Sequence, residues 1–313
     1  MTAAAPHLQA LRAGGKLALA RALAALEAAP QAPSTLALLD EAWAEPLGQV
    51  IGLTGPPGVG KSTLTSALVQ TWRARGRRVG IIAIDPSSRR SGGALLGDRT
   101  RIALDPEDRG VFLRSLAARD RLGGLAALAA PMTVLMRALF DIVLVETVGV
   151  GQSETEIEEL ADSVVLAVQP ASGDALQFMK AGIVEIPDVA IVTKADLGDL
   201  AGRTARELRM ALRQAGGRQA GWILPVLLVS SQTGQGMEEL VATLDRHALH
   251  LREQDPAQQR RHAQGRAWLV AALREEVGRR GLARALPHLE SLPLEAAPFG
   301  ALARLLDRLS ESG

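Results

Sequence analysis

The feature that most constrains the fold of this chain is a glycine-rich segment, Gly55-Pro56-Pro57-Gly58-Val59-Gly60-Lys61-Ser62, followed by Thr63. It comes directly after an apolar, β-branched run at residues 50–53 and before a helical pattern at residues 63–75. Glycines allow a tight loop whose successive N–H groups point at phosphate oxygens, and the start of the helix adds a partial positive charge. The segment therefore predicts a strand–loop–helix unit that binds nucleotide phosphates, with Lys61 on the β- and γ-phosphates and Ser62 on Mg²⁺.

The chain beyond this segment alternates short apolar runs with helical patterns, which is typical of an α/β fold. The run at residues 142–145 is apolar on both faces, as expected for a parallel sheet covered by helices on each side. We expect an α/β protein with a mostly parallel sheet of the P-loop NTPase type. The expected strands are residues 50–53, 79–85, 111–113, 141–146, 163–168, 189–193 and 225–229.

Both ends of the chain carry helical patterns without strands. We expect an N-terminal helical extension at residues 1–46, a central nucleotide-binding domain at residues 47–250, and a C-terminal helical arm at residues 251–313. Pro30 and Pro33 end the first helical run. The arm is rich in arginine, which fits either a solvated polar face or a contact with a second subunit or partner.

A second motif ends the apolar run at residues 141–146, where Glu146 is followed by Thr-Val-Gly149. A phosphate-binding protein of this type needs a carboxylate for the magnesium shell and a backbone N–H for the γ-phosphate at this place. We therefore expect Glu146 to serve the metal and Gly149 to serve the phosphate.

A third motif, Thr193-Lys194-Ala195-Asp196, ends another apolar run and bears on the identity of the base. The Asp196 carboxylate can accept hydrogen bonds from N1–H and the 2-amino group of guanine, whereas adenine offers no donor at either place. The motif predicts GTP rather than ATP, with Lys194 lying along the base. The last predicted strand leads into further candidates for the base loop, Ser230, Ser231 and Gln232.

Two positions depart from the usual guanine-binding pattern, in which Asn stands at the place of Thr193 and Ala at the place of Ser231. Thr193 is shorter and has no amide, so we expect a contact to the base or to the phosphate-binding loop to be lost. We expect the departures to affect guanine affinity more than guanine preference.

Two acids follow the second predicted strand in a loop rich in serine and glycine. Asp85 opens Asp-Pro-Ser-Ser-Arg-Arg-Ser-Gly-Gly, and Asp98 lies in Gly-Asp-Arg-Thr-Arg. They are candidates for holding a metal-bound water or positioning the attacking water. Helix capping by Asp and Ser is the alternative interpretation.

Together these motifs, and above all Glu-Thr-Val-Gly-Val-Gly-Gln-Ser-Glu at residues 146–154, resemble the methylmalonyl-CoA mutase-associated GTPases. That family, MeaB/ArgK, belongs to the SIMIBI class of P-loop GTPases, and the resemblance covers nearly the whole chain. It implies a homodimeric GTPase chaperone whose C-terminal arm is the dimerisation element. The chaperone would gate adenosylcobalamin loading onto methylmalonyl-CoA mutase or a related acyl-CoA mutase, and would protect or reactivate that enzyme.

The resemblance also implies roles for individual residues. Glu154 would respond to the γ-phosphate, and Asp174 and Lys180 would form a switch loop that faces the mutase. The implied metal set is Ser62, Asp85, Asp98 and Glu146, and the implied catalytic set is Lys61, Asp85, Asp98, Glu146 and Glu154.

Composition excludes several other classes of protein. Lys plus Arg number 35 against 34 Asp plus Glu, so the net charge of +1 gives no reason to expect nucleic acid or an anionic membrane as partner. Cys is absent, which excludes disulfide scaffolds and thiolate metal sites. We expect a soluble, cytoplasmic protein.

Three rival interpretations remain open. A metallochaperone GTPase for nickel or zinc needs clustered soft or imidazole ligands. The histidines here are scattered, and we interpret His247 and His250, which share a helical spacing, as a surface pair. A P-loop kinase of a transport system is disfavoured by Asp196. A nucleotide-sensing module with incidental hydrolysis differs from the favoured interpretation mainly in the rate of hydrolysis.

Overall fold

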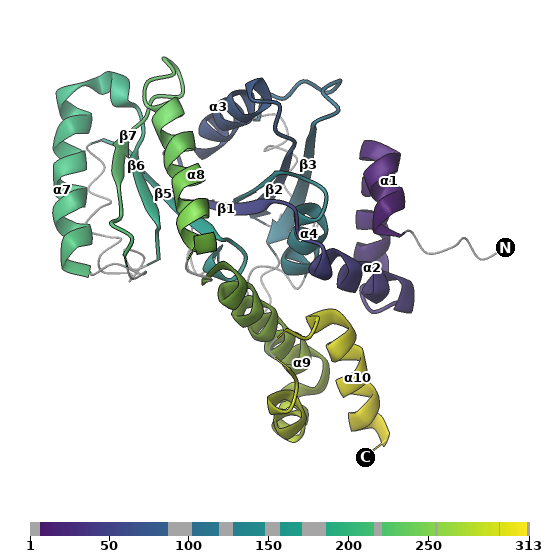
Figure 1. Ribbon diagram of the computed structural model, residues 1–313. Helices are drawn as coiled ribbons and strands as arrows, with labels where there is room; N and C mark the ends of the chain where they lie inside the picture. The colour runs from purple at the N-terminus through teal and green to yellow at the C-terminus, as the bar shows by residue number, and fades with distance from the viewer. Residues whose placement is uncertain are drawn as a thin grey trace.

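The computed structural model describes residues 7–86, 102–118, 128–147, 157–170, 186–215, 221–253, 256–293 and 295–311. Its centre is a seven-stranded sheet in which every pairing is parallel, in the order β3-β2-β4-β1-β5-β6-β7 (Figure 1). The strands are β1 (Gln49–Thr54), β2 (Val79–Pro86), β3 (Val111–Ala118), β4 (Ile142–Glu146), β5 (Ser163–Val168), β6 (Val189–Val192) and β7 (Val226–Leu228). The predicted parallel α/β fold is confirmed.

The third strand is longer than expected, because it continues past Leu113 to Ala118. Within the described part of the chain β3 pairs only with β2, at one end of the strand order. An edge strand can carry polar side chains within its span. Here Arg114 forms an ion pair with Glu27 of the first helix.

Helices cover both faces of the sheet, as the sequence predicts. The face with Ile51 and Leu53 packs against α3 (Lys61–Ala74) and α8 (Met237–Glu253). The face with Val50 and Val143 packs against α4 (Ala129–Arg137), and α7 (Asp199–Ala215) covers the same face further along at β5 to β7. Side chains of a strand alternate between its faces, which is why consecutive residues of β1 enter different cores.

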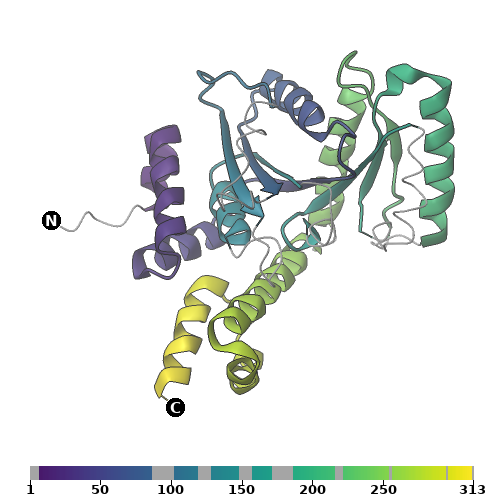
Figure 2. The same ribbon diagram turned by 180° about the vertical axis from the view of Figure 1, so that it is seen from behind.

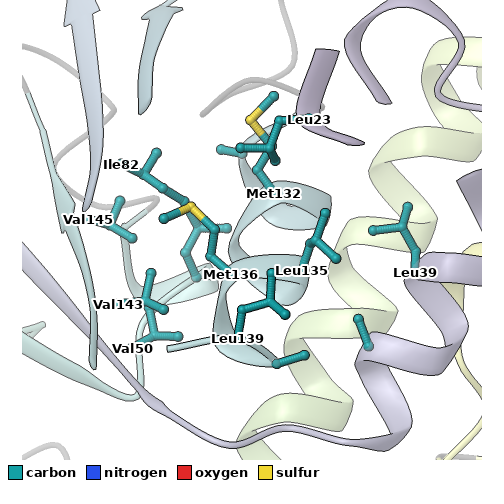
Figure 3. Close-up of a cluster of buried hydrophobic side chains, with 14 of the residues drawn as sticks. Leu23, Leu39, Val50, Ile82, Met132, Leu135, Met136, Leu139, Val143 and Val145 are labelled. Carbon is teal, nitrogen blue, oxygen red and sulfur yellow. The ribbon is translucent and has the colours of Figure 1, made fainter. Parts of the chain in front are cut away.

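The N-terminal segment forms two helices, α1 (Leu8–Ala28) and α2 (Pro33–Ala44), that pack onto α4. Pro33 occupies the first turn of α2, where its missing N–H is not needed. Figure 3 shows Leu23 of α1 and Leu39 of α2 near Met132 and Leu135 of α4. Met136 of the same helix packs against the sheet. These helices therefore extend the core on this face of the sheet.

The C-terminal segment forms α9 (Pro256–Glu290) and α10 (Pro298–Glu311), which lie side by side and project from the sheet in both views (Figures 1 and 2). Leu269 and Leu273 of α9 pack against Leu302 and Leu305 of α10 in a separate small core. The helical course of α9 is interrupted at Gly278, where φ is 67°. No described helix is long and apolar enough to cross a membrane.

Aspartates stand immediately before three strands and cap the start of a neighbouring strand. The carboxylate of Asp141 accepts from the N–H of Arg78 at 2.7 Å, that of Asp162 from Val50 at 2.8 Å, and that of Asp188 from Val164 at 2.9 Å. Backbone N–H groups at strand ends need partners when they are buried. This row of aspartates defines the amino edge of the sheet.

The two most buried aspartates, Asp162 and Asp188, are paired with arginines. Arg137 pairs with Asp162, and the side chains of both are 6% exposed. Burial by itself raises the pKa of Asp162, but the Arg137 guanidinium and the hydrogen bonds from Arg137 and the N–H of Val50 outweigh it and hold the pKa below its usual value. Arg260 of α9 lies 3.5 Å from the Asp188 carboxylate and donates to the carbonyl of Asp162. The arm is thus tied to the amino edge.

The interpretation of His247 as a surface residue is wrong. Its ring is fully buried, with Nδ1 2.6 Å from Ser163 Oγ and Nε2 3.6 Å from Asp188 Oδ1. The helical spacing places His247 and His250 on the same side of α8, but that side faces the sheet and Trp222. Ser163, His247 and Asp188 resemble a nucleophile–base–acid series, yet none is more than 1% exposed, so a substrate cannot reach them.

Candidate functional site

The glycine-rich loop joins β1 to α3, as expected, and its backbone explains its glycines. Gly55, Gly58 and Gly60 have φ values of 142°, 78° and 97°, in the region that side chains disfavour. A Cβ on Gly55 would also lie 2.1 Å from the carbonyl oxygen of Ala167 in β5. The loop can therefore curl tightly only with glycine at these places, and it delivers the chain to the first turn of α3.

Lys61 lies at the start of α3 with its side chain turned back over the loop. Its Nζ donates to the carbonyl oxygens of Gly55 at 2.7 Å and Pro56 at 3.1 Å, and the residue is 7% exposed. An ammonium held at a helix N-terminus beside a ring of backbone N–H groups is suited to phosphate oxygens. Pro57 in the loop and Thr63 in the first turn of α3 are exposed.

Glu146 ends β4 beside β1, opposite Leu53, and points at the start of α3. Its Oε1 accepts from Ser62 Oγ at 2.8 Å, and its Oε2 accepts from Thr65 Oγ1 at 2.7 Å. The predicted neighbours Ser62 and Glu146 are thus in contact. Thr65 was not predicted, although its position three residues after Ser62 on a helix places both on one face.

The Ser62 and Glu146 oxygens fit magnesium. Mg²⁺ is a hard cation that takes oxygen ligands, and proteins usually bind it through one or two carboxylates together with substrate phosphates. The described residues contain no group of three or more His, Asp or Glu side chains able to hold an ion by themselves. A hydroxyl and a carboxylate beside a phosphate-binding loop match a magnesium that is shared with the nucleotide.

The predicted base loop follows β6. Lys194 has a φ of 54°, and its exposed side chain donates to Gln169 at the end of β5. Asp196 is exposed, and one of its carboxylate oxygens, Oδ1, accepts from Ser230 Oγ at 2.5 Å. Ser230 follows β7 and is fully buried, so it holds the Asp196 carboxylate from beneath.

Thr193 keeps a contact with the phosphate-binding loop. Its Oγ1 lies 2.9 Å from the carbonyl oxygen of Val59 and 3.1 Å from that of Val168, and it is the donor to both. We expected a contact to the base or to this loop to be lost. A contact to the loop is present, because the hydroxyl reaches that backbone without an amide. Thr193 is 5% exposed and ties the base loop to the phosphate loop.

Of the other predicted site residues, three are among the described residues and five lie outside them. Ser231 is half-buried and Gln232 exposed in the turn after Ser230, at the same edge of the sheet. Asp85 lies at the end of β2 by its backbone, opposite Ala117 of β3. Five predictions lie outside the described residues, namely Asp98, Gly149, Glu154, Asp174 and Lys180.

Comparison with known proteins gives a consistent result. Residues 19–285 match the family described as methylmalonyl-CoA mutase-associated GTPase MeaB. A relative from Pyrococcus horikoshii is 44% identical over 207 residues, which cover 65% of this chain and 65% of that protein. A Mycobacterium bovis protein named Probable GTPase Mb1533 is 40% identical, covering 72% of this chain and 68% of its own.

A mouse protein named Methylmalonic aciduria type A homolog, mitochondrial, is 36% identical and is covered over 57% of its length, against 74% of this chain. The chain thus spans less than two thirds of the length of several relatives.

Among solved structures, one entitled LAO/AO transport system kinase has a TM-score of 0.66 at 24% identity, over 97% of this chain and 95% of its own. A hydrogenase maturation factor HypB from Archaeoglobus fulgidus has a TM-score of 0.51 at 17% identity, over 66% and 93%. These two likenesses show the fold alone.

Proposed function

The chain belongs to the family of methylmalonyl-CoA mutase-associated GTPases, and from this premise we propose that it hydrolyses GTP to GDP and phosphate at the carboxyl edge of its sheet. The observation that carries the proposal is the linkage of three strand ends. Ser62 joins the phosphate loop to Glu146 after β4, and Thr193 joins the same loop to the base motif after β6. A nucleotide in this place would meet phosphate, metal and base contacts together.

The chain's own residues supply most of the chemistry. The loop N–H groups and the Lys61 ammonium would hold the β- and γ-phosphates, with Lys61 exchanging the carbonyl oxygens of Gly55 and Pro56 for phosphate oxygens. Ser62 and Glu146 would hold magnesium, which when bound neutralises the charge that develops on the phosphate oxygens. We expect slow hydrolysis by the protein alone, because the sequence offers no evident water-positioning Gln or arginine finger.

Guanine would be read by Asp196. Ser230 holds one oxygen of this carboxylate, which fixes the carboxylate at the edge of the sheet while the residue remains exposed. Two charge-assisted hydrogen bonds to guanine are worth about 1.5–3 kcal/mol each, and adenine cannot form them. This argues against the transport-system kinase.

The activity and base assignment are tested together. Phosphate release from GTP should depend on Mg²⁺, and ATP should be used at least about a hundredfold less efficiently. Asp196→Asn should shift preference towards xanthosine triphosphate, whose O2 accepts a hydrogen bond. Asp199→Asn, an exposed neighbour at the start of α7, should leave preference unchanged. Equal use of GTP and ATP by the parent would overturn the base assignment.

The client we propose is a cobalamin-dependent acyl-CoA mutase, most simply methylmalonyl-CoA mutase, whose adenosylcobalamin loading the protein would gate. The family description and the name of the mouse relative support this choice. A ligand shifts an equilibrium only by its differential affinity for two states, so GTP and GDP forms must bind the mutase differently. If Asp174 and Lys180 form the switch loop, Asp174→Ala and Lys180→Ala should lose most mutase-stimulated GTP turnover and keep the basal rate. Equal stimulation of parent and variants would overturn that role.

We further propose that residues 251–313 mediate a homodimer. In support, α9 carries an apolar groove lined by Ala263, Ala267, Val270 and Ala271, together with Arg266 and Arg274. The alanines recur every four residues, so they form one stripe on which a helix of a second copy can pack closely. Light scattering should show a dimer for the parent and a monomer for Ala267→Glu, with Ala24→Glu at an exposed place on α1 as control. A monomeric parent at tens of micromolar would overturn the proposal.

A further inference from the structure

The hydroxyls of Ser62 and Thr65 hold the two oxygens of one carboxylate. Both residues lie on the face of α3 that meets the end of β4, with Ser62 on Oε1 of Glu146 at 2.8 Å and Thr65 on Oε2 at 2.7 Å. A carboxylate bound at one oxygen can still rotate about its terminal torsion, which has a broad profile. Contacts at both oxygens fix its plane.

The two hydroxyls differ in their surroundings. Ser62 is half-buried at the mouth of the phosphate loop, whereas Thr65 is fully buried and Glu146 is 6% exposed. Water therefore has poor access to the Thr65–Glu146 contact and cannot readily replace the Thr65 hydroxyl. Ser62 is shared with the proposed magnesium, while Thr65 lies about one turn further along α3 from the loop.

Other hydroxyls on α3 show that the Thr65 contact is specific to its place. Ser66 Oγ donates to the carbonyl of Ser62 at 3.1 Å, and Thr71 Oγ1 donates to the carbonyl of Ala67 at 2.9 Å. This return to the carbonyl four residues earlier is the common arrangement for serine and threonine within a helix. Thr65 instead donates across to the neighbouring strand end.

We propose that Thr65 is a positioning residue that fixes the plane of the Glu146 carboxylate so that Oε1, together with Ser62, is presented to magnesium. The inference rests on the proposed magnesium site and adds a residue that lies outside the phosphate-binding motif. Without the Thr65 hydroxyl the carboxylate would keep its charge but lose its fixed orientation, so the metal would bind more weakly.

The test measures the Mg²⁺ concentration that gives half of the magnesium-dependent gain in affinity for a fluorescent GDP analogue, with purified full-length protein. Thr65→Val, which removes the hydroxyl at nearly constant volume, should need about tenfold more Mg²⁺, as expected for losing one hydrogen bond to a charged group. Affinity in EDTA should stay within about twofold of the parent. Thr65→Ser should restore the parental requirement.

Thr71→Val is the matched control, since it removes a threonine hydroxyl from the same helix without touching Glu146. It should leave the Mg²⁺ requirement unchanged. Thermal unfolding of each variant separates loss of folding from loss of orientation.

A double-mutant cycle keeps the test decisive if Thr65→Val is poorly stable. In a Glu146→Gln background, adding Thr65→Val should change the Mg²⁺ requirement much less than in the parent, because the two residues act together. Equal effects in both backgrounds, or a parental requirement in Thr65→Val, would overturn the inference. A parent whose GDP affinity is indifferent to Mg²⁺ would instead overturn the proposed magnesium site, and the inference with it.

Discussion

Both edges of the central sheet carry carboxylates, but the carboxylates have different partners at the two edges. At the amino edge, Asp162 and Asp188 are buried and bound by strand N–H groups and arginines. At the carboxyl edge, Asp196 is exposed, and the two carboxylate oxygens of Glu146 accept from the hydroxyls of Ser62 and Thr65. A carboxylate already neutralised by arginine has little to offer a ligand, whereas one held by neutral donors keeps its charge available. The partner of an acid, rather than the acid itself, separates the structural edge from the proposed binding edge.

Among the tests of this contrast, the largest effect is expected for Arg137→Met at the amino edge. It leaves the Asp162 carboxylate buried without its main cation, which should cost about 3–5 kcal/mol of unfolding free energy. Urea unfolding measures the loss, and GDP affinity of the folded protein should stay within about twofold. A loss below about 1 kcal/mol would mean that the pair does not hold the edge together.

Lys61→Ala tests the carboxyl edge, where we expect a large loss of GTP affinity and a small loss of stability. Removing the ammonium should weaken GTP binding by about a hundredfold or more, since charge-assisted contacts to phosphate are lost. Unfolding free energy should change less than in Arg137→Met, because Lys61 donates to two loop carbonyl oxygens, whereas Arg137 pairs with a buried carboxylate. Calorimetric titration with GTP gives the first quantity and urea unfolding the second. Unchanged GTP affinity would remove Lys61 from the site.

Acid should lower the unfolding free energy by less than Arg137→Met does, because a protonated Asp162 keeps some of its hydrogen bonds. The pKa of Asp162 is lowered in the folded protein. Its contribution to stability is therefore complete above the unfolded value of about 3.9 and is lost as pH falls towards the folded pKa. Urea midpoints measured from pH 7 to pH 3 should fall less steeply in Asp162→Asn. An identical slope in variant and parent would contradict the assignment.

The smallest effect is expected for Thr193→Val, which removes the hydroxyl that reaches Val59. GDP affinity should fall by about 0.5–1.5 kcal/mol, the net value of one neutral hydrogen bond, because the base loop is no longer tied to the phosphate loop. Thr204→Val, whose hydroxyl donates within α7, is the control. Tighter binding by Thr193→Val would show that the contact strains the site.

Sequence predicted what depends on a local pattern. The strands could be predicted because a parallel strand covered by helices on both faces is a continuous apolar run in the sequence. The glycine loop could be predicted because its backbone conformation requires glycine. Thr65 was missed because a threonine four residues into a helix looks ordinary until the end of β4 is placed beside it. His247 was misjudged since spacing on α8 tells which residues share a side but not what that side faces.

The contact between Thr193 and Val59 was missed for a related reason, because it joins residues 134 positions apart. The aspartates before three strands were visible in the sequence, yet an Asp before a strand also suits an exposed loop. What decided their role was the arginines that reach them, and one of these comes from the C-terminal arm.

The row of aspartates also bears on how the sheet avoids misassembly. Strands such as β4 are apolar on both faces, so sliding one strand past its neighbour would exchange one apolar contact for another and hydrophobicity would barely oppose it. A slide of even one residue moves the chain by about 3.3 Å, which takes each carboxylate away from the single N–H it caps. Asp141, Asp162 and Asp188 therefore favour the correct alignment of the strands, because only that alignment lets each carboxylate cap its N–H group.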